Sequence, residues 1–151
     1  GRIHDQASAE AYAARILAAP RTPQSYNALG DAIAYAMAMI RSSPIQGDKA
    51  VIDVSGDGPD NRSHVPAPVA RDEAVRAGIT INALAVVKEG SSTAERGERL
   101  VTSYTRDVIG GPGAFVVVAR DYPDFAQAIF NKMIREIAQA VMGKDLAGVS
   151  R

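Results

Sequence analysis

Hydrophobic and polar positions follow two different periods along the chain, and the changes of period divide it into helices and strands. Three short segments are almost wholly apolar and end at glycines or polar residues, as expected of buried strands in a parallel sheet. In the remaining segments apolar residues recur every three to four positions, the spacing of a helix that buries one face. The expected helices cover residues 8–19, 27–41, 65–77, 95–108 and 123–142, and the expected strands cover 50–55, 79–87 and 114–119.

Residues with known preferences for helix ends mark several of these boundaries. A side-chain oxygen at the first position can accept a hydrogen bond from an open backbone N–H group, and glycine favours the C-terminal end. The expected N-caps are Ser8, Asn27 and Asp121, and the expected C-terminal stops are Gly78 and Gly143. The GGPG segment at 110–113 precedes a strand, which indicates a tight turn and not a phosphate-binding loop.

Strands and helices alternate over most of the chain, which predicts a parallel sheet with right-handed crossovers. The expected fold class is α/β, with three layers in which helices cover both faces of the sheet, as in Rossmann-like proteins. We expect one domain over residues 2–142 and a disordered tail over 143–151.

Composition narrows the possible functions. The 151 residues carry 17 basic and 17 acidic side chains, so the formal net charge is zero. This balance argues against binding to nucleic acid or to an anionic membrane surface, because both require an excess of basic residues. No run of 18 apolar residues predicts a membrane span. The chain contains no cysteine, which excludes disulfides, thiolate nucleophiles and zinc–thiolate sites.

The polar loop after the first expected strand is the richest in candidate ligands. It spans residues 56–64 and contains Asp57, Asp60 and Asn61. In open parallel sheets, ligands bind outside the carboxyl ends of the strands, which is where this loop lies. Asp57 stands between two glycines and is either a hard ligand for Mg²⁺ or a turn residue. Asp53, inside the strand, is interpreted as a hydrogen-bonded structural residue, and His64 as a solvated loop residue.

Four segments carry a resemblance to a known family. They are VIDVSGDGPDN (51–61), AGITINAL (77–84), RDVIGGPGAFVV (106–117) and ARDYPDFAQAI (119–129). The first resembles the fourth-strand motif of von Willebrand factor A (vWA) domains, and residues 3–138 are similar to an uncharacterised bacterial vWA-like family. The resemblance begins after the third strand of such a domain, so it implies that the chain corresponds to the C-terminal part. It also favours a periplasmic or secreted location.

The resemblance further implies a metal-ion-dependent adhesion site. Its DxSxS motif has no counterpart in this chain, and Asn27 in SYNALGDAI (25–33) stands where the family has threonine. Asp57 and Asn27 are therefore the expected ligands of a degenerate site. The nearby candidates are Ser25, Ser55, Asp60 and Asn61. A lone carboxylate binds Mg²⁺ weakly, so we expect no tightly bound metal or other cofactor here, although the complete domain would use Mg²⁺.

In the family that the chain resembles, the strand at 50–55 pairs with the first strand of the domain. The resemblance implies that this first strand is absent here, so one edge of the strand at 50–55 is left open. An apolar edge with unpaired backbone groups is a template for another chain. We therefore expect a protein partner or self-association, with a homodimer through this edge or a fragment paired with its remaining half.

These features predict a non-enzymatic binding or protein-interaction module. The alternative is a small Mg²⁺-dependent α/β hydrolase or phosphate-handling enzyme that uses Asp57 and Asp60. Serine nucleophiles are disfavoured because the G-x-S-x-G elbow is missing and no base is identifiable. A second acidic strand end, close to Asp57, would distinguish the enzyme from the binding module.

Overall fold

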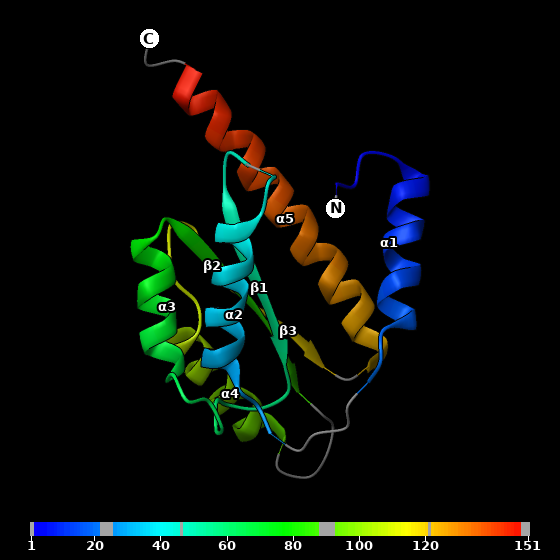
Figure 1. Cartoon of the computed structure of the whole chain (residues 1–151). Coiled ribbons are helices and arrows are strands. Elements are labelled where there is room, and N and C mark those ends of the chain that lie inside the picture. The colour runs from blue at the N-terminus through cyan, green and yellow to red at the C-terminus, as the bar shows by residue number, and fades with distance from the viewer. Residues whose placement is uncertain (1, 22–25, 46, 88–92, 121, 149–151) are drawn as a thin grey trace.

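A three-stranded parallel sheet lies between two layers of helices in the computed structural model of the protein (Figure 1). The structure describes residues 2–21, 26–45, 47–87, 93–120 and 122–148. Along the chain, the elements of these residues are α1 (Gln6–Ala18), α2 (Leu29–Ser42), β1 (Ala50–Gly56), α3 (Ala67–Arg76), β2 (Ile79–Val87), α4 (Thr93–Asp107), β3 (Val116–Arg120) and α5 (Tyr122–Gly148). The strand order is β1-β2-β3, which confirms the expected α/β class with helices on both faces.

Several helix ends differ from the sequence prediction. The N-cap of α1 is Asp5, and Ser8 is its reciprocal partner three residues later. The N-cap of α2 is Ala28, which has no capping side chain, so the prediction of Asn27 was wrong. The open N–H groups of α2 are satisfied instead from the β1–α3 loop.

The last helix is longer than expected, and the third strand is shorter. The prediction that Gly143 ends the helix was wrong, because α5 continues to Gly148 and an internal glycine costs a helix only about 1 kcal/mol. Strand β3 begins at Val116, since the N–H of Ala114 closes the glycine turn and that of Phe115 donates to the Asn82 side chain. The predicted cap Asp121 lies outside the described residues. Gly78 has the predicted left-handed φ of 77°.

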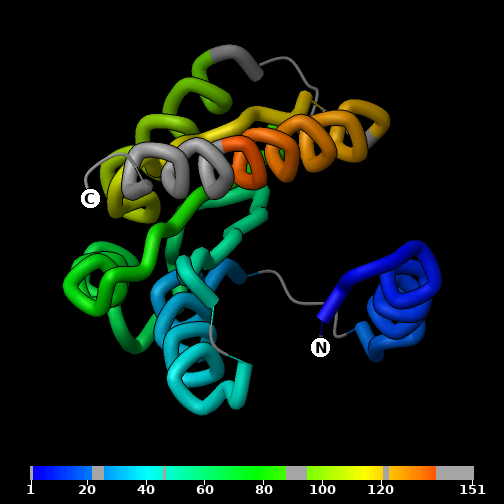
Figure 2. The backbone as a smooth tube through the Cα atoms, turned by 90° about the horizontal axis from the view of Figure 1, so that it is seen from above, coloured from blue at the N-terminus to red at the C-terminus, as the bar shows by residue number. Residues whose placement is uncertain are grey.

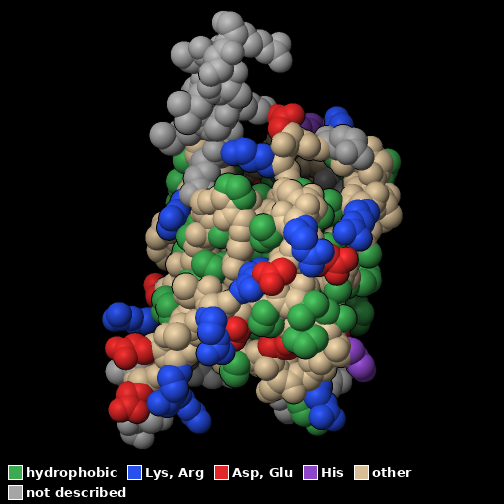
Figure 3. Space-filling model, turned by 90° about the vertical axis from the view of Figure 1, so that its left-hand side faces the viewer, with side chains coloured by type: hydrophobic (Ala, Val, Ile, Leu, Met, Phe, Trp, Pro, Cys, Tyr) green, Lys and Arg blue, Asp and Glu red, His purple; other side chains and the backbone are tan. Residues whose placement is uncertain are grey.

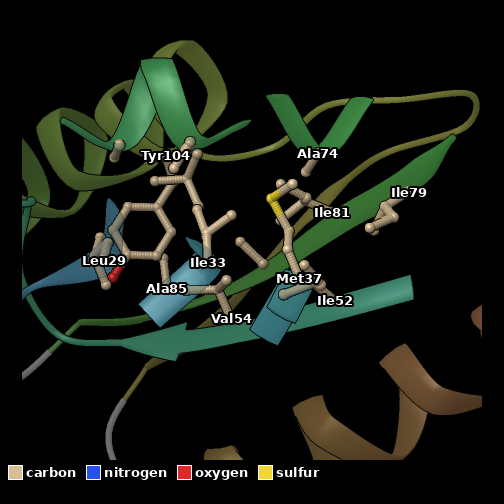
Figure 4. Packing of buried hydrophobic residues seen from close by; sticks show 14 of the residues in the cluster. Leu29, Ile33, Met37, Ile52, Val54, Ala74, Ile79, Ile81, Ala85 and Tyr104 are labelled. Carbon is tan, nitrogen blue, oxygen red and sulfur yellow. The ribbon is translucent and has the colours of Figure 1, made fainter. Parts of the chain in front are cut away.

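The first face of the sheet is covered by α2, α3 and α4, which enclose the larger core. Its buried side chains come from alternate positions of β1 and β2 and from one stripe on each helix. Figure 4 shows the Tyr104 ring of α4 directed toward Leu29, with Ile33 and Ala85 nearby. Tyr104 and Ile33 are wholly buried, so this contact fixes α4 and α2 against the sheet.

The second face is covered by α5, which packs over β2 and β3 around a small apolar cluster. Beside it lies a buried polar group: Lys132 is 1% exposed and pairs with Asp53 of β1 and with Glu136, its Nζ lying 2.7 Å from Glu136 Oε1. Asn82 donates to the same Glu136 oxygen at 2.7 Å. Asp53 is thus a paired structural residue, as interpreted from the sequence.

Helix α1 stands apart from the rest of the protein (Figure 2). Within the described residues it contacts no other helix or strand, and none of its side chains is buried. Tyr12, Ile16 and Leu17 therefore remain exposed. No described helix is long and apolar enough to cross a membrane.

Candidate functional site

The β1–α3 loop lies at the carboxyl ends of the strands, where ligands of parallel sheets bind. Two glycines let it approach its neighbours closely. A Cβ atom on Gly56 would lie 2.4 Å from the Tyr104 hydroxyl oxygen, and one on Gly58 would lie 2.5 Å from the Asn27 Nδ2 atom. The loop backbone therefore lies directly against α4 on one side and against the segment that leads into α2 on the other.

Asp60 links the starts of two helices. Its Oδ1 atom accepts from the Leu29 N–H at 3.0 Å and also from the Ser63 hydroxyl, and its Oδ2 atom accepts from the Ala67 N–H at 3.0 Å. The Ser63 oxygen in turn accepts from the Gly30 N–H at 2.9 Å. A carboxylate at a helix N-terminus is stabilised by the open N–H groups and the helix dipole. Asp60 therefore acts as a structural cap for α2 and α3 together.

Asp31, in the first turn of α2, fastens the loop from the opposite direction. Its carboxylate accepts from the backbone N–H groups of His64 and Val65, each at 3.0 Å, and lies 2.9 Å from His64 Nδ1. The Val65 N–H, followed by the His64 side chain, lowers the pKa of Asp31 to about 2. His64 is exposed, and its ring bonds to this carboxylate.

The hydrogen bonds to Asp31 predict a specific dependence of stability on pH. Since the native pKa of about 2 lies below the ordinary value of 3.8, Asp31 stabilises the fold fully above 3.8, and this is lost as pH falls toward 2. The Asp31→Asn protein is expected to unfold at a lower urea concentration than the wild type. The difference between the two midpoints should be constant near neutral pH and should shrink below about pH 4. Urea denaturation of both proteins between neutral and strongly acidic pH measures this. A difference that is the same at every pH would contradict it.

The structure brings most of the predicted site residues into one region. Asn27 and Asn61 pair directly: the Asn27 N–H donates to Asn61 Oδ1 at 3.0 Å, and the Asn61 N–H donates to the Asn27 carbonyl at 2.9 Å. The Asn27 side chain reaches Gly58, the residue after Asp57. Ser55 is exposed on β1 at the start of the loop. Ser25 lies outside the described residues.

Asp57 is exposed, and it influences Tyr104 across the loop. The Tyr104 hydroxyl donates to the Gly58 carbonyl at 3.0 Å. Burial, and to a smaller extent the negative charge of Asp57, raises the pKa of Tyr104 to about 12. The phenol therefore stays protonated over the ordinary pH range and holds the loop next to Asp57 in place.

A pocket of about 540 Å³ opens beside Asp57, between the loop and α4. Its lining residues come from the loop, from the end of β2 and from one side of α4: Asp57, Gly58, Pro59, Val86, Val87, Arg96, Arg99 and Leu100. The volume is in the range of pockets that bind small molecules.

Figure 3 shows the side of the molecule that is on the left in Figure 1. Basic and acidic side chains are mixed across it, without a large patch of one charge.

The described residues around Asp57 do not fit a tight Mg²⁺ site. Mg²⁺ favours octahedral oxygen coordination and gives up its waters reluctantly. Asp60 is already held by two backbone N–H groups and a hydroxyl. No group of three or more histidine or acidic residues suited to a metal occurs among the described residues.

Sequence patterns missed the importance of Asp31, Tyr104 and the two pocket arginines. A weak signal existed for Arg96 and Arg99, because residues three apart in a helix lie on the same side. Their place beside Asp57 depends on how α4 packs, which no local pattern reveals. Acidic residues are common in the first turn of a helix, so Asp31 gives no signal of its own. Its hydrogen-bond partners are more than 30 positions away in the sequence.

The fold and the site together define a small α/β protein with a braced polar loop and a pocket at the carboxyl end of its parallel sheet. Over residues 1–141 the chain matches the family described as Protein of unknown function (DUF1194), and it belongs to that family. No curated protein and no solved structure matches the chain.

Proposed function

We propose that this protein is a vWA-like binding and interaction module and not an enzyme, with Asp57 in a degenerate adhesion-type site. The observation that carries the proposal is the bracing of the β1–α3 loop. Asp60 and Ser63 of the loop accept from backbone N–H groups at the helix starts, and Asp31 of α2 accepts from the loop N–H groups of His64 and Val65. These bonds stabilise one loop conformation. A rigid loop beside a pocket suits recognition, since little conformational entropy is lost on binding.

The contacts of the loop also favour binding over hydrolysis. A hydrolase that uses Asp57 and Asp60 needs both carboxylates directed at one substrate or metal. Here both Asp60 oxygens serve as helix caps. Ser63 donates to Asp60, and His64 pairs with Asp31, so neither the serine nor the histidine is arranged as part of a nucleophile–base pair.

Calorimetric titration with Mg²⁺ and Mn²⁺ tests the degenerate character of the site. We expect no saturable binding at submillimolar concentrations, because among the described residues no set of three acidic or histidine side chains gathers with Asp57 to replace the waters of Mg²⁺. The Asp57→Ala protein is the control and is expected to give the same heats as the wild type. Submillimolar binding that Asp57→Ala abolishes would show a working metal site and contradict this part of the proposal.

We further propose that β1 pairs with a second copy of the chain. No described strand pairs with the outer edge of β1. On the second face of the sheet, Val51 is 42% exposed, and Phe130, Ile134 and Ile137 of α5 expose more than half of their side-chain surface. An unpaired edge next to exposed apolar side chains favours pairing with another strand.

Size-exclusion chromatography with light scattering is expected to give about twice the chain mass of 15.9 kDa. Val51→Lys places a charge at this edge and is expected to shift the protein to monomer. Val69→Lys is the matched control, since Val69 is 52% exposed on α3, on the opposite face, and its replacement should leave the dimer intact. A wild-type protein that runs as a well-behaved monomer, or a dimer that Val51→Lys does not weaken, would refute pairing through β1.

A further inference from the structure

The pocket beside Asp57 combines an apolar base with charged walls. Leu100 is 8% exposed and forms the base with Val87, while Pro59 of the loop adds apolar surface. Val86 also lines the pocket, but its side chain packs in the cluster on the second face of the sheet. Arg96 and Arg99 stand on one side of α4, because residues three apart in a helix are neighbours. Both arginines are exposed at the pocket, and Asp57 lies on the loop side.

The charges around the pocket indicate the class of ligand. The two arginines and one aspartate give a surplus of one positive charge among the described lining residues. One oxygen of Glu95 lies 3.5 Å from Arg99 Nη1, but both side chains are more than 60% exposed, so this pair is weak and exchangeable. A singly charged anion matches the surplus, whereas a doubly charged phosphate would be opposed by Asp57.

We propose that this pocket binds a small organic acid, with its carboxylate on Arg96 and Arg99 and its apolar body on Val87 and Leu100. Planar guanidinium groups donate paired hydrogen bonds to carboxylates, which makes arginine suited to this ligand. The apolar base supplies the hydrophobic contribution to affinity. The inference rests on the proposed binding role of this end of the sheet, but it needs neither a metal ion nor the β1 edge.

Titration with 4-methylpentanoate, followed by calorimetry and by NMR of the labelled protein in the presence of a chelator, tests the proposal. Arg96→Gln and Arg99→Gln are each expected to weaken binding about tenfold, as for the loss of a hydrogen bond between charged groups. Asp57→Asn is expected to strengthen binding about two- to fivefold, since it removes a repelling charge near the carboxylate. Arg106→Gln, on the same helix but outside the pocket, is the matched control and should bind as the wild type does.

Two further probes separate the parts of the ligand. 4-Methylpentanamide has the same apolar body with a neutral amide in place of the carboxylate, and inorganic phosphate is an anion without an apolar body. Neither is expected to bind measurably. The proposal is overturned if 4-methylpentanoate does not bind at millimolar concentrations, if both probes bind as well as it does, or if the arginine variants bind unchanged. None of these outcomes alters the metal titration or the oligomeric state, so failure here is distinguishable from failure of the proposed function.

Discussion

Gly30→Ala is expected to lower the free energy of unfolding by about 3 kcal/mol, because it forces a methyl group into a packed backbone. A Cβ atom at this position would lie 1.9 Å from the Val65 carbonyl oxygen and 2.8 Å from the Ala67 nitrogen. Alanine improves helix propensity by about 1 kcal/mol, but the clash is with backbone that cannot rotate away. The start of α2 must then move away from the start of α3, which disturbs the bonds of Asp60 and Ser63.

Urea denaturation followed by circular dichroism measures this loss. Gly97→Ala is the control, because Gly97 also lies inside a helix and the described atoms nearest to its added methyl group belong to the Val87 side chain, the closest at 3.2 Å. We expect Gly97→Ala to stay within about 1 kcal/mol of the wild type, since the gain in helix propensity offsets a small shift of Val87. If both variants change stability equally, the close contact of α2 with the α3 entrance is not important for the fold.

Lys132→Ala is expected to lower the free energy of unfolding by about 2 to 3 kcal/mol, less than for a fully buried ion pair because the Asp53 side chain is 46% exposed and that of Glu136 is 20% exposed. Lys132 is the centre of the polar group on the second face of the sheet, bonded to Asp53 and Glu136. Burial lowers the pKa of Lys132, and the hydrogen bond and charge of Glu136 oppose that shift. Without the ammonium group, Glu136 is left as an uncompensated charge with a side chain only 20% exposed.

A pair of further variants separates charge from packing. Lys132→Met keeps the long apolar stem but still leaves Glu136 unpaired, so it should remain destabilised. Adding Glu136→Gln removes that charge while the amide oxygen still accepts from Asn82, so the double variant should be more stable than Lys132→Met alone. The explanation fails if Lys132→Met alone matches the wild type, or if Glu136→Gln makes it worse.

Much of the fold follows from local patterns. The apolar runs of β1 and β2 and the glycine at position 78 were enough to predict both strands and the crossover between them. The run of β2 reflects burial on both faces of the sheet, whereas β1 is buried only at alternate positions. The loop after β1 was also predicted to lie at the ligand end of the sheet, since this follows from strand order and direction alone. Helix ends were predicted less well, as Asn27 and Gly143 show, because a cap can come from a residue far along the chain.

The sequence by itself determined the fold class, the absence of any cysteine chemistry and the position of Asp57 at the end of a strand. The roles of the residues around Asp57 were decided only by the tertiary structure. Asp60 was a metal candidate by composition, but it is a helix cap because α2 and α3 present their open N–H groups to it. Arg96 and Arg99 were unremarkable on an exposed helix, and they line a pocket because α4 packs beside the loop. Local patterns record which groups a residue carries, whereas long-range packing decides which partners those groups meet.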